Sequence, residues 1–542
     1  MSFLSWTFSR VAKLDRPITR RVQVERGVRI PIADGTLSVA NRYFPSNGEG
    51  LPVILIRTPY GQSRSKPYAE VFAQRGYQVV VQCCRGTSGS QGEWLPFQTD
   101  REDGVATISW IRRQPWFGAK LGMFGQSYMG FVQWAVAADL PEEIGALALQ
   151  ITASAPREMM FAGGPFALRT MAAWTHLVGS QAQGVSNLRY TVQHFLKVPK
   201  AYNQTPLSEV DRFALGQHFP FFQQIVESEH DDAPLWRAMD FSDRVAEVKA
   251  PAHFLTGWFD IFLRGQLADY ARLRDAGRAP QLMIGPWGHT SPGLLKPVFR
   301  ESLRLFDAHL RELPTTGTEY SVRVFLMGAR EWVDLPTWPP DTRPTTLYLQ
   351  SNKMLTESAP GDGLPDRYRF DPRDPTPDPG GNSDPGFGSH DNRKLEARSD
   401  VLTYTTKALS SDVDVMGTVV ADLYVNSSLE ATDFVARLCD VSPRGKSTNV
   451  CDGVLRLGAR NTDRRPTGPQ KIGVEMWPTA YRFRMGHRIR LQVASGAHPR
   501  FARNFGSGEP IGSATVFNVA EQEVFHDQDH QSALILPVGL MR

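Results

Sequence analysis

The sequence predicts an α/β protein with a largely parallel sheet covered by helices on both faces, a helical insertion, and a C-terminal β-sandwich. Two observations predict this. Up to about residue 156, continuous apolar strand-like runs alternate with helix-like stretches, the pattern of parallel sheets buried on both faces. Beyond about Thr342, short strand-like runs follow one another between turns, as in all-β sandwiches.

The alternation in the first part defines the core. The predicted strands are 22–29, 37–44, 51–58, 77–83, 120–124 and 146–151. The predicted helices are 68–75, 103–114 and 127–138. Pro67 suits the first turn of its helix because the missing N–H has no helical partner there.

From about Arg157 to Arg244 the pattern changes, because aromatic residues punctuate helix-like polar stretches without a strong strand run. We expect a helical cap at 157–244. The α/β pattern resumes with a strand at 252–256, a helix at 262–276, a strand at 281–284 and a helix at 298–310. The core is therefore expected at 22–156 and 245–335.

The remainder, 336–542, is predicted to be a jelly-roll β-sandwich. Its expected strands are 345–349, 401–405, 416–425, 434–441, 453–457, 472–477, 488–494 and 533–537. The segment 358–390 is dense in Pro, Gly and Asp and is predicted to be a long surface excursion.

Composition excludes several classes of partner. A chain of 542 residues exceeds one ordinary core. Its net charge of +4, from 60 basic and 56 acidic side chains, makes no case for nucleic acid or an anionic membrane. No apolar h-region follows the basic N-terminal stretch, and no run reaches the roughly 18 apolar residues of a membrane span. We expect neither a secretory signal nor a membrane partner.

The cysteines predict a reducing cytoplasm as the location. Cys83 and Cys84 are adjacent and cannot easily bridge. Cys439 and Cys451 could face each other across a hairpin, but two buried thiols are the expected state. No zinc-type spacing occurs, and no metal or cofactor is predicted.

The stretch Phe124-Gly125-Gln126-Ser127-Tyr128-Met129-Gly130 lies between the strand 120–124 and the helix 127–138. It resembles the Gly-x-Ser-x-Gly elbow of α/β-hydrolases, which exposes a serine hydroxyl at a sharp strand-to-helix turn. The second glycine comes one place late, with Met129 in its usual position. The context nevertheless predicts that Ser127 is a nucleophile.

A serine needs a base to remove its proton and an acid to orient that base. In this fold they follow in the order Ser, Asp, His. Asp260 follows the strand 252–256 through Gly257-Trp258-Phe259, and His289 follows the strand 281–284 through Gly285-Pro286-Trp287-Gly288. Both are expected at the same sheet edge as Ser127, with Asp260 orienting His289.

The developing oxyanion also needs donors. The backbone N–H of Tyr128, directly after the serine, is the expected first donor. The second comes from the loop after an early strand, which here reads Pro59-Tyr60-Gly61 without a Gly-Gly doublet. The Tyr60 hydroxyl could serve, or Tyr60 could be a packed loop aromatic. The glycine-rich stretch 84–92 lacks the Gly-Lys-[Ser/Thr] ending of a phosphate loop and is expected at the sheet rim.

Taken together, the motifs resemble those of hydrolases related to bacterial cocaine esterase and Xaa-Pro dipeptidyl-peptidase. The residues that carry the resemblance are Arg57-Thr58-Pro59-Tyr60, Arg85-Gly86 with Gly89-Ser90 and Gly92, Gly125 to Gly130, Gly257 to Asp260, Pro286 to His289, and 432–438 and 486–491 in the third domain. The resemblance implies an α/β-hydrolase core, a cap and a jelly roll. It implies that Ser127, His289 and Asp260 form the triad and that Tyr60 and Tyr128 form the oxyanion hole. Cys84 departs from the family pattern, in which Asp often precedes Arg-Gly.

We expect a metal-free serine hydrolase that cleaves small-molecule esters or amides through an acyl-enzyme. An apolar acyl pocket is predicted from the aromatic residues Phe166, Trp174, Trp258, Phe259 and Phe262. Three alternatives stay open. An Xaa-Pro dipeptidyl-peptidase and an α-amino-acid ester or β-lactam acyl hydrolase both need acidic groups for a substrate amine, and none is identified in the cap. The third is a carbohydrate-binding protein with a decayed hydrolase.

Overall fold

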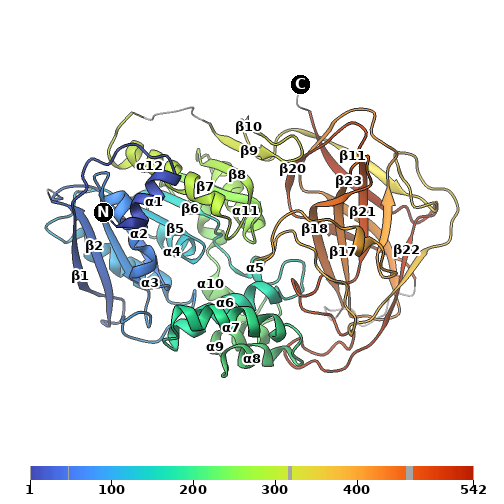
Figure 1. The fold of residues 1–542 in the computed structure, drawn as a ribbon, viewed down its shortest axis with the longest axis horizontal. Helices are drawn as coiled ribbons and strands as arrows, with labels where there is room; N and C mark the ends of the chain where they lie inside the picture. Colours follow the sequence, from blue (N-terminus) through green and yellow to red (C-terminus); the bar gives the residue numbers. More distant parts are fainter. Residues whose placement is uncertain (1, 47, 315–319, 459–467, 541–542) are drawn as a thin grey trace. The chain divides into compact units, whose positions relative to one another are not determined.

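The computed structural model describes residues 2–46, 48–314, 320–458 and 468–540, which form two compact units (Figure 1). The first unit consists of Met1–Pro156, Pro234–Gly257 and Phe262–Arg323. The second consists of Arg157–Ala233, Trp258–Ile261 and Val324–Arg542. The α/β-hydrolase core, helical cap and C-terminal β-sandwich predicted from the sequence are all present, so the fold class is confirmed.

The first unit holds the α/β core. Its strands are β1 (Val22–Pro31), β2 (Leu37–Pro45), β3 (Val53–Thr58), β4 (Gln78–Cys83), β5 (Leu121–Gln126), β6 (Ile144–Gln150), β7 (Ala252–Phe259) and β8 (Gln281–Gly288). Its α-helices are α1 (Phe3–Val11), α2 (Gln62–Ala73), α3 (Asp100–Arg112), α4 (Tyr128–Ala137), α10 (Pro234–Met239), α11 (Leu263–Asp275) and α12 (Leu295–Leu310). The short helices η2 (Ser242–Glu247) and η3 (Pro292–Leu294) complete it.

The strand order has its topological switch point in the middle of the core sheet. The strands lie in the order β1-β2-β4-β3-β5-β6-β7-β8. β3 pairs in parallel with both β4 and β5, and β6 pairs in parallel with β5 and β7. After β3 the chain adds β4 on one side and β5 with the later strands on the other side, so the switch point lies between β3 and β5. In open α/β sheets, ligands bind outside the carboxyl ends of the strands at such a point.

Side chains alternate between the two covered faces of this sheet. On one face, Phe124 of β5 packs edge-on against Phe72 of α2 at 4.9 Å, and Phe299 of α12 lies 5.8 Å from Phe72. On the other face, Phe254 of β7 lies 5.9 Å from Trp134 of α4 and 6.0 Å from Tyr270 of α11. Both faces are thus buried, which explains why the central strands are apolar throughout.

The second unit contains the cap helices and the sandwich. The cap has α5 (Arg157–Met160), α6 (Leu168–Ala182), α7 (Asn187–Ala201), η1 (Leu207–Glu209), α8 (Val210–Leu215) and α9 (Pro220–Glu227). The strands β9 (Val322–Leu326), which begins at the unit boundary, and β10 (Glu331–Leu335) precede the sandwich. The cap is tied to the sandwich by backbone hydrogen bonds, since the Arg456 N–H donates to Gly163 O and the Ala502 N–H donates to Phe166 O, each at 2.8 Å.

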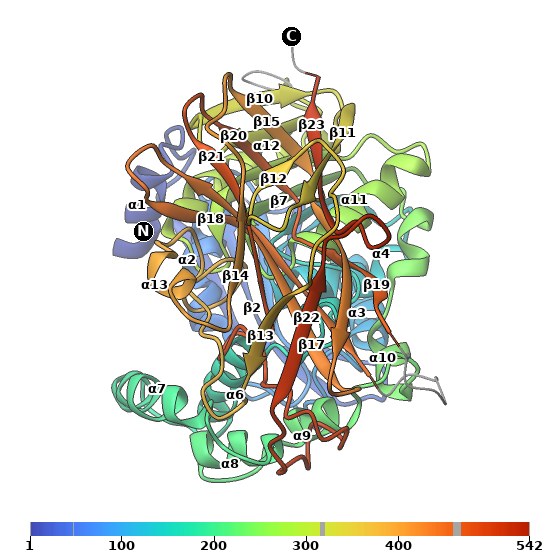
Figure 2. The same ribbon diagram turned by 90° about the vertical axis from the view of Figure 1, so that its right-hand side faces the viewer.

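The sandwich consists of two antiparallel sheets, whose long strands are visible in Figure 2. The larger sheet contains β11 (Thr342–Leu349), β12 (Leu355–Thr356), β13 (Asp366–Phe370), β15 (Val413–Gly417), β16 (Val420–Ser427), β19 (Gln470–Glu475), β20 (Thr479–Phe483), β22 (Ala520–Phe525) and β23 (Ala533–Gly539). The smaller sheet contains β14 (Leu402–Thr405), β17 (Thr432–Val441), β18 (Ser447–Leu457) and β21 (Arg488–Ala494). A short helix, α13 (Arg393–Glu396), precedes β14. Residues from both sheets, such as Leu423 and Phe434, share one buried core.

Several sequence predictions are wrong in detail. Pro67 lies in the interior of α2 instead of its first turn, because the helix already begins at Gln62. The polar stretch before Pro67 carries no apolar period, so no periodic signal predicts a helix there. The strand predicted at 416–425 is two strands, β15 and β16, and β20 and β22 were not predicted.

The segment 358–390 is not the surface excursion that was predicted. It contains β13, which pairs with β22, and its central residues Asp378, Asn382 and Ser383 are buried. Turn-forming composition predicts where the chain bends, but it does not report which polar residues the rest of the fold covers.

The four cysteines are buried and free. In the β17–β18 ladder Cys451 faces Leu438 and Cys439 faces Asn449, which confirms the expected buried thiols. Within the described ranges, no helix combines the length and apolar character needed to cross a bilayer.

Candidate active site

Ser127 occupies a sharp turn between β5 and α4. Its backbone has φ 57° and ψ −123°, a conformation that residues with a Cβ rarely adopt and that is typical of a nucleophile elbow. The Ser127 N–H donates to Gln150 O at 3.0 Å, and the Thr152 hydroxyl donates to Ser127 O at 2.9 Å. Bonds from the end of β6 therefore hold the turn on both sides of the serine.

Close approaches explain both glycines of the motif. A Cβ on Gly125 would lie 2.3 Å from Met129 Cβ, and a Cβ on Gly130 would lie 2.5 Å from Thr152 Cβ. Neither contact is possible between real side chains. The late second glycine thus has a steric cause, because position 130 faces Thr152.

The structure brings His289 and Ser127 together. His289 directly follows β8, and its Nε2 lies 3.0 Å from Ser127 Oγ. This distance lets the hydroxyl donate to a neutral imidazole, the arrangement that activates a serine. The ring of Phe262 lies 5.5 Å from the imidazole, centre to centre, and packs against it.

Asp260 lies directly after β7 and is fully buried. The strand is longer than predicted, because Gly257, Trp258 and Phe259 continue it rather than forming a loop. The Asp260 backbone oxygen accepts a hydrogen bond of 2.9 Å from the side-chain amide of Asn382. Sequence reasoning missed Asn382, since it lies in the Pro- and Gly-rich segment 358–390 and no motif marks it.

The two tyrosines of the predicted oxyanion hole differ in their surroundings. Tyr60 follows the carboxyl end of β3, and its N–H donates to Thr58 Oγ1 at 3.1 Å. Tyr128 is the first residue of α4, where backbone N–H groups have no partner within the helix. Its hydroxyl donates to Asp100 at 2.6 Å and accepts from the Phe97 N–H at 2.9 Å. Burial and the adjacent Asp100 raise the pKa of Tyr128.

Cys84, the departure from the family pattern, is buried in the same region, and burial raises the pKa of its thiol. Burial also raises the pKa of Asp100, although Arg57 lies 3.5 Å away. The next residue, Arg85, makes a two-pronged ion pair with Asp103, with distances of 3.0 and 2.6 Å. The stretch 85–92 is thus a loop after β4 at the rim of the sheet, as expected.

The predicted pocket residues have different surroundings. Phe166 is fully buried between Phe161 and Phe222, with ring distances of 5.4 and 5.8 Å. Trp174 packs against Phe221 at 5.8 Å. Phe259 and Phe262 are buried.

Trp258 is also buried, and its indole N–H donates to Phe325 O at 2.7 Å. Its ring lies 5.2 Å from Trp338. The ring of Phe262, another of the predicted pocket residues, packs against His289.

A cavity of about 370 Å³ lies within the second unit, between the cap and the sandwich. Its walls include the carboxylates Glu158, Glu229 and Asp231 and the aromatic residues Phe161, Tyr202 and Phe505. Glu229 accepts the Ile511 N–H at 3.1 Å, and Asp231 is paired with Arg157. These acidic groups of the cap were not identified from the sequence.

Comparison with known proteins agrees with this architecture. Residues 34–291 match the family model of X-Pro dipeptidyl-peptidase (S15 family), and residues 316–535 match that of the X-Pro dipeptidyl-peptidase C-terminal non-catalytic domain. Cocaine esterase from Rhodococcus sp. (strain MB1 Bresler) is 30% identical over 573 aligned positions, covering 95% of this chain and 98% of that protein.

Solved structures share the fold over nearly the whole chain. An α-amino acid ester hydrolase superposes with a TM-score of 0.83 at 22% identity, covering 97% of this chain and 98% of the other. An aminopeptidase from a marine sediment Thaumarchaeota archaeon superposes with a TM-score of 0.81 at 19% identity, with the same coverage.

These matches confirm the predicted resemblance and the expected class of enzyme. Both family models lie on the parts of the chain that form the core and the sandwich. The chain therefore belongs to the X-Pro dipeptidyl-peptidase (S15) family of serine hydrolases, to which cocaine esterase is related.

Proposed function

We propose that this protein is an esterase that hydrolyses small, neutral, partly apolar carboxylic esters. The observation that carries the proposal is the 3.0 Å separation of Ser127 Oγ and His289 Nε2 at a strained strand-to-helix turn. Ser127 is the nucleophile, His289 the general base and acid, and Asp260 the residue that orients His289.

The proposed reaction has two halves. Ser127 Oγ attacks the ester carbonyl carbon while His289 Nε2 takes the hydroxyl proton. The N–H of Tyr128 and the hydroxyl of Tyr60 stabilise the oxyanion. His289 then returns the proton to the leaving alcohol as the C–O bond breaks. In the second half, water attacks the acyl-enzyme, His289 takes its proton, and the acid is released with Ser127 restored.

The charge of the chain and the surroundings of His289 support this substrate class. The chain is close to electrical neutrality for its size, and the Phe262 ring packs on His289. Phe262 is therefore the best-supported member of the acyl pocket, in which we also propose Phe166, Trp174, Trp258 and Phe259. A cytoplasmic location is proposed because all four cysteines are free thiols.

A fluorophosphonate probe should label the wild-type protein at Ser127 and abolish aryl-ester hydrolysis. Ser127→Ala should lose both labelling and turnover, because it removes the hydroxyl that lies 3.0 Å from His289 Nε2. Ser38→Ala removes a buried serine hydroxyl elsewhere in the same unit and should retain both. Labelling that persists in Ser127→Ala, measured by mass spectrometry of peptides, would refute the assignment of the nucleophile.

Tyr60→Phe should raise the activation barrier by about 2–4 kcal/mol, because one oxyanion donor is lost. That corresponds to a fall in kcat of roughly 30- to 1000-fold. Tyr77→Phe is the matched control, since it removes a hydroxyl that instead donates to Asp307 at 2.6 Å. A kcat for Tyr60→Phe equal to that of the control would show that the Tyr60 hydroxyl is not an oxyanion donor and that the side chain only packs in the loop.

The rate of ester hydrolysis should fall as the pH drops through the ordinary histidine range, roughly pH 6 to 7. Protonated imidazole cannot accept the Ser127 proton, so activity is present above the pKa of the base and lost below it. The measurement is kcat/KM against pH for a substrate without ionisable groups. A profile that stays flat down to about pH 4 would contradict the role of His289.

A second candidate function is the hydrolysis of substrates that carry a free α-amine. The cavity lined by Glu158, Glu229 and Asp231 favours it, because such substrates need carboxylates to hold an ammonium group. The pairing of Asp231 with Arg157 weakens the case by compensating one negative charge.

Paired substrates separate the two functions. The esterase proposal expects aryl esters to be hydrolysed with a higher kcat/KM than α-amino-acid esters, Xaa-Pro amides or β-lactams. Glu158→Gln should then change kcat/KM equally for an acyl ester and its α-amino counterpart. A loss of about tenfold or more confined to the amine-bearing member, which is about 1.4 kcal/mol, would favour the second candidate.

A further inference from the structure

Asn382 bonds to the main chain on both sides of Phe259, at the end of the strand that leads to Asp260. Its side-chain amide donates one N–H to Trp258 O and the other to Asp260 O, both at 2.9 Å. Asn382 as a whole residue is 5% exposed. All four of these residues belong to the second compact unit, which includes Trp258–Ile261.

These two bonds restrict the direction of the Asp260 side chain. β7 ends at Phe259, so the carbonyls at this end lie where the regular ladder stops. A buried carbonyl needs a donor, and one planar amide supplies both donors in fixed geometry. Fixing the carbonyls of residues 258 and 260 leaves little freedom in the torsions between them, and these torsions set where the Asp260 Cβ points.

A further contact anchors the same three residues. The Trp258 indole N–H donates to Phe325 O at 2.7 Å, and its ring packs on Trp338. The segment 258–260 is thus held at its first residue by Phe325 and Trp338, and across its length by Asn382. All of these partners come from later in the chain than residue 324.

Asn382 is itself held by a tightly packed loop. Gly381 and Gly388 exchange backbone hydrogen bonds of 2.9 and 3.0 Å. Gly381 has φ 103°, and a Cβ there would lie 2.9 Å from Asp452 Oδ2 and 3.0 Å from an Arg500 nitrogen. Both the backbone conformation and the close approach of the charged groups therefore require glycine directly before Asn382.

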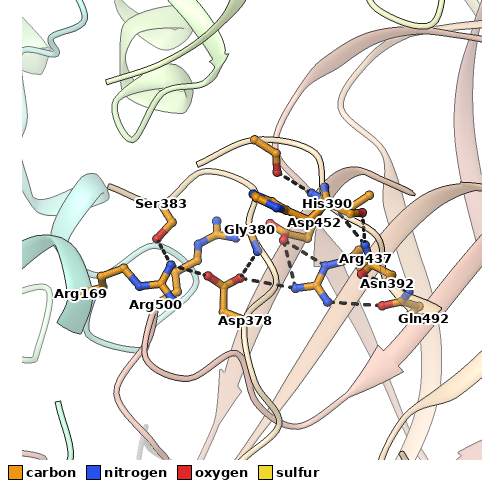
Figure 3. A network of polar contacts seen from close by, with 12 residues as sticks. Arg169, Asp378, Gly380, Ser383, His390, Asn392, Arg437, Asp452, Gln492 and Arg500 are labelled. Carbon is orange, nitrogen blue, oxygen red and sulfur yellow. Dashed lines mark hydrogen bonds and ion pairs between the residues drawn. The ribbon is translucent and has the colours of Figure 1, made fainter. Parts of the chain in front are cut away.

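Buried ion pairs also hold the loop that contains Asn382 (Figure 3). Asp378 lies 2.9 Å from Arg169 of the cap and 3.8 Å from Arg437 of β17, and its Oδ1 accepts the Gly380 N–H at 3.2 Å. Arg169 also donates to the Ser383 hydroxyl at 3.0 Å. The bonds to Gly380 and Ser383 bracket Asn382 along the chain.

Asp452 of β18 completes the network. Arg437 lies 3.3 Å from its carboxylate and Arg500 lies 2.6 Å from it. The side chains of all three residues are buried. Because a buried charge without its partner is costly, this arrangement tolerates little displacement of the loop.

We propose that Asn382 is a positioning residue for Asp260, held in place by the Arg169–Asp378–Arg437–Asp452–Arg500 network. The inference rests on the proposed function, in which Asp260 orients and stabilises the protonated form of His289. Asn382 touches neither substrate nor reacting atoms. It acts by fixing the backbone that carries the acid.

The test compares Asn382→Ala with wild type in kcat, KM and the pH dependence of kcat/KM for an aryl ester. Loss of both donors should lower kcat by about 10- to 100-fold through misplacement of the acid, with little change in KM. A carboxylate placed less well stabilises the imidazolium less, so the acid limb of the profile should move to lower pH by about half a unit to one unit.

Asn382→Ser keeps one hydroxyl donor and should fall between wild type and Asn382→Ala. If Asn382→Ala does not fold, the same kinetic measurements are made on Asn382→Ser. Gln78→Ala is the matched control, because Gln78 is also buried and its amide donates to two main-chain carbonyls, Leu51 O at 2.9 Å and Trp116 O at 2.7 Å. The control should lose thermal stability but keep the kcat and the acid limb of wild type.

Two outcomes would overturn the inference. One is a folded Asn382 variant with wild-type kcat and pH profile. The other is an equal shift of the acid limb in Gln78→Ala, which would reflect a general loss of stability. Failure of the proposed function itself looks different, since the wild type would then be inactive toward esters or Ser127→Ala would be as active as wild type.

Discussion

The positive φ of 57° at Ser127 is the constraint on which the arrangement of the core depends. Such a backbone costs about 1–3 kcal/mol and persists only where its surroundings determine it. Here the end of β6 supplies the hydrogen bonds, through Gln150 and Thr152, and Gly130 allows α4 to approach Thr152. The strained serine, the strand beside it and the helix after it are therefore fixed together.

Parallel pairing explains why residues far apart in the sequence follow strands that end at one edge. β3 and β5 are neighbours and run in the same direction, so Tyr60 and Ser127 both follow carboxyl ends of adjacent strands. His289 follows β8 and lies within hydrogen-bonding distance of Ser127. The sheet order supplies this arrangement, and the loops need only be short enough to keep each residue close to its strand end.

Much of the core sheet and of the turn at Ser127 could be predicted from the sequence, because the patterns that identify them are local. Apolar runs identified β3, β4, β5 and β6, and the glycine pattern around Ser127 identified the turn. Failures occurred where tertiary contacts override composition. Pro67 was expected at the start of a helix, yet α2 begins five residues before it. The polar composition of 358–390 predicted an exposed segment, yet Asp378 and Asn382 are buried. Contacts with the cap and with strands more than fifty residues away in sequence bury them.

The network behind Asn382 is better explained by geometry than by stability. Pairing buried Arg and Asp side chains contributes little net stability, because desolvation offsets the attraction, whereas displacing one partner is strongly unfavourable. Apolar side chains would hold the loop with less directional control. Charged groups that each accept or donate in one direction instead specify where Gly380 to Ser383 must lie. A loop that positions Asp260 has reason to be built in this way, because catalytic groups must be held within about 0.5 Å of their productive geometry.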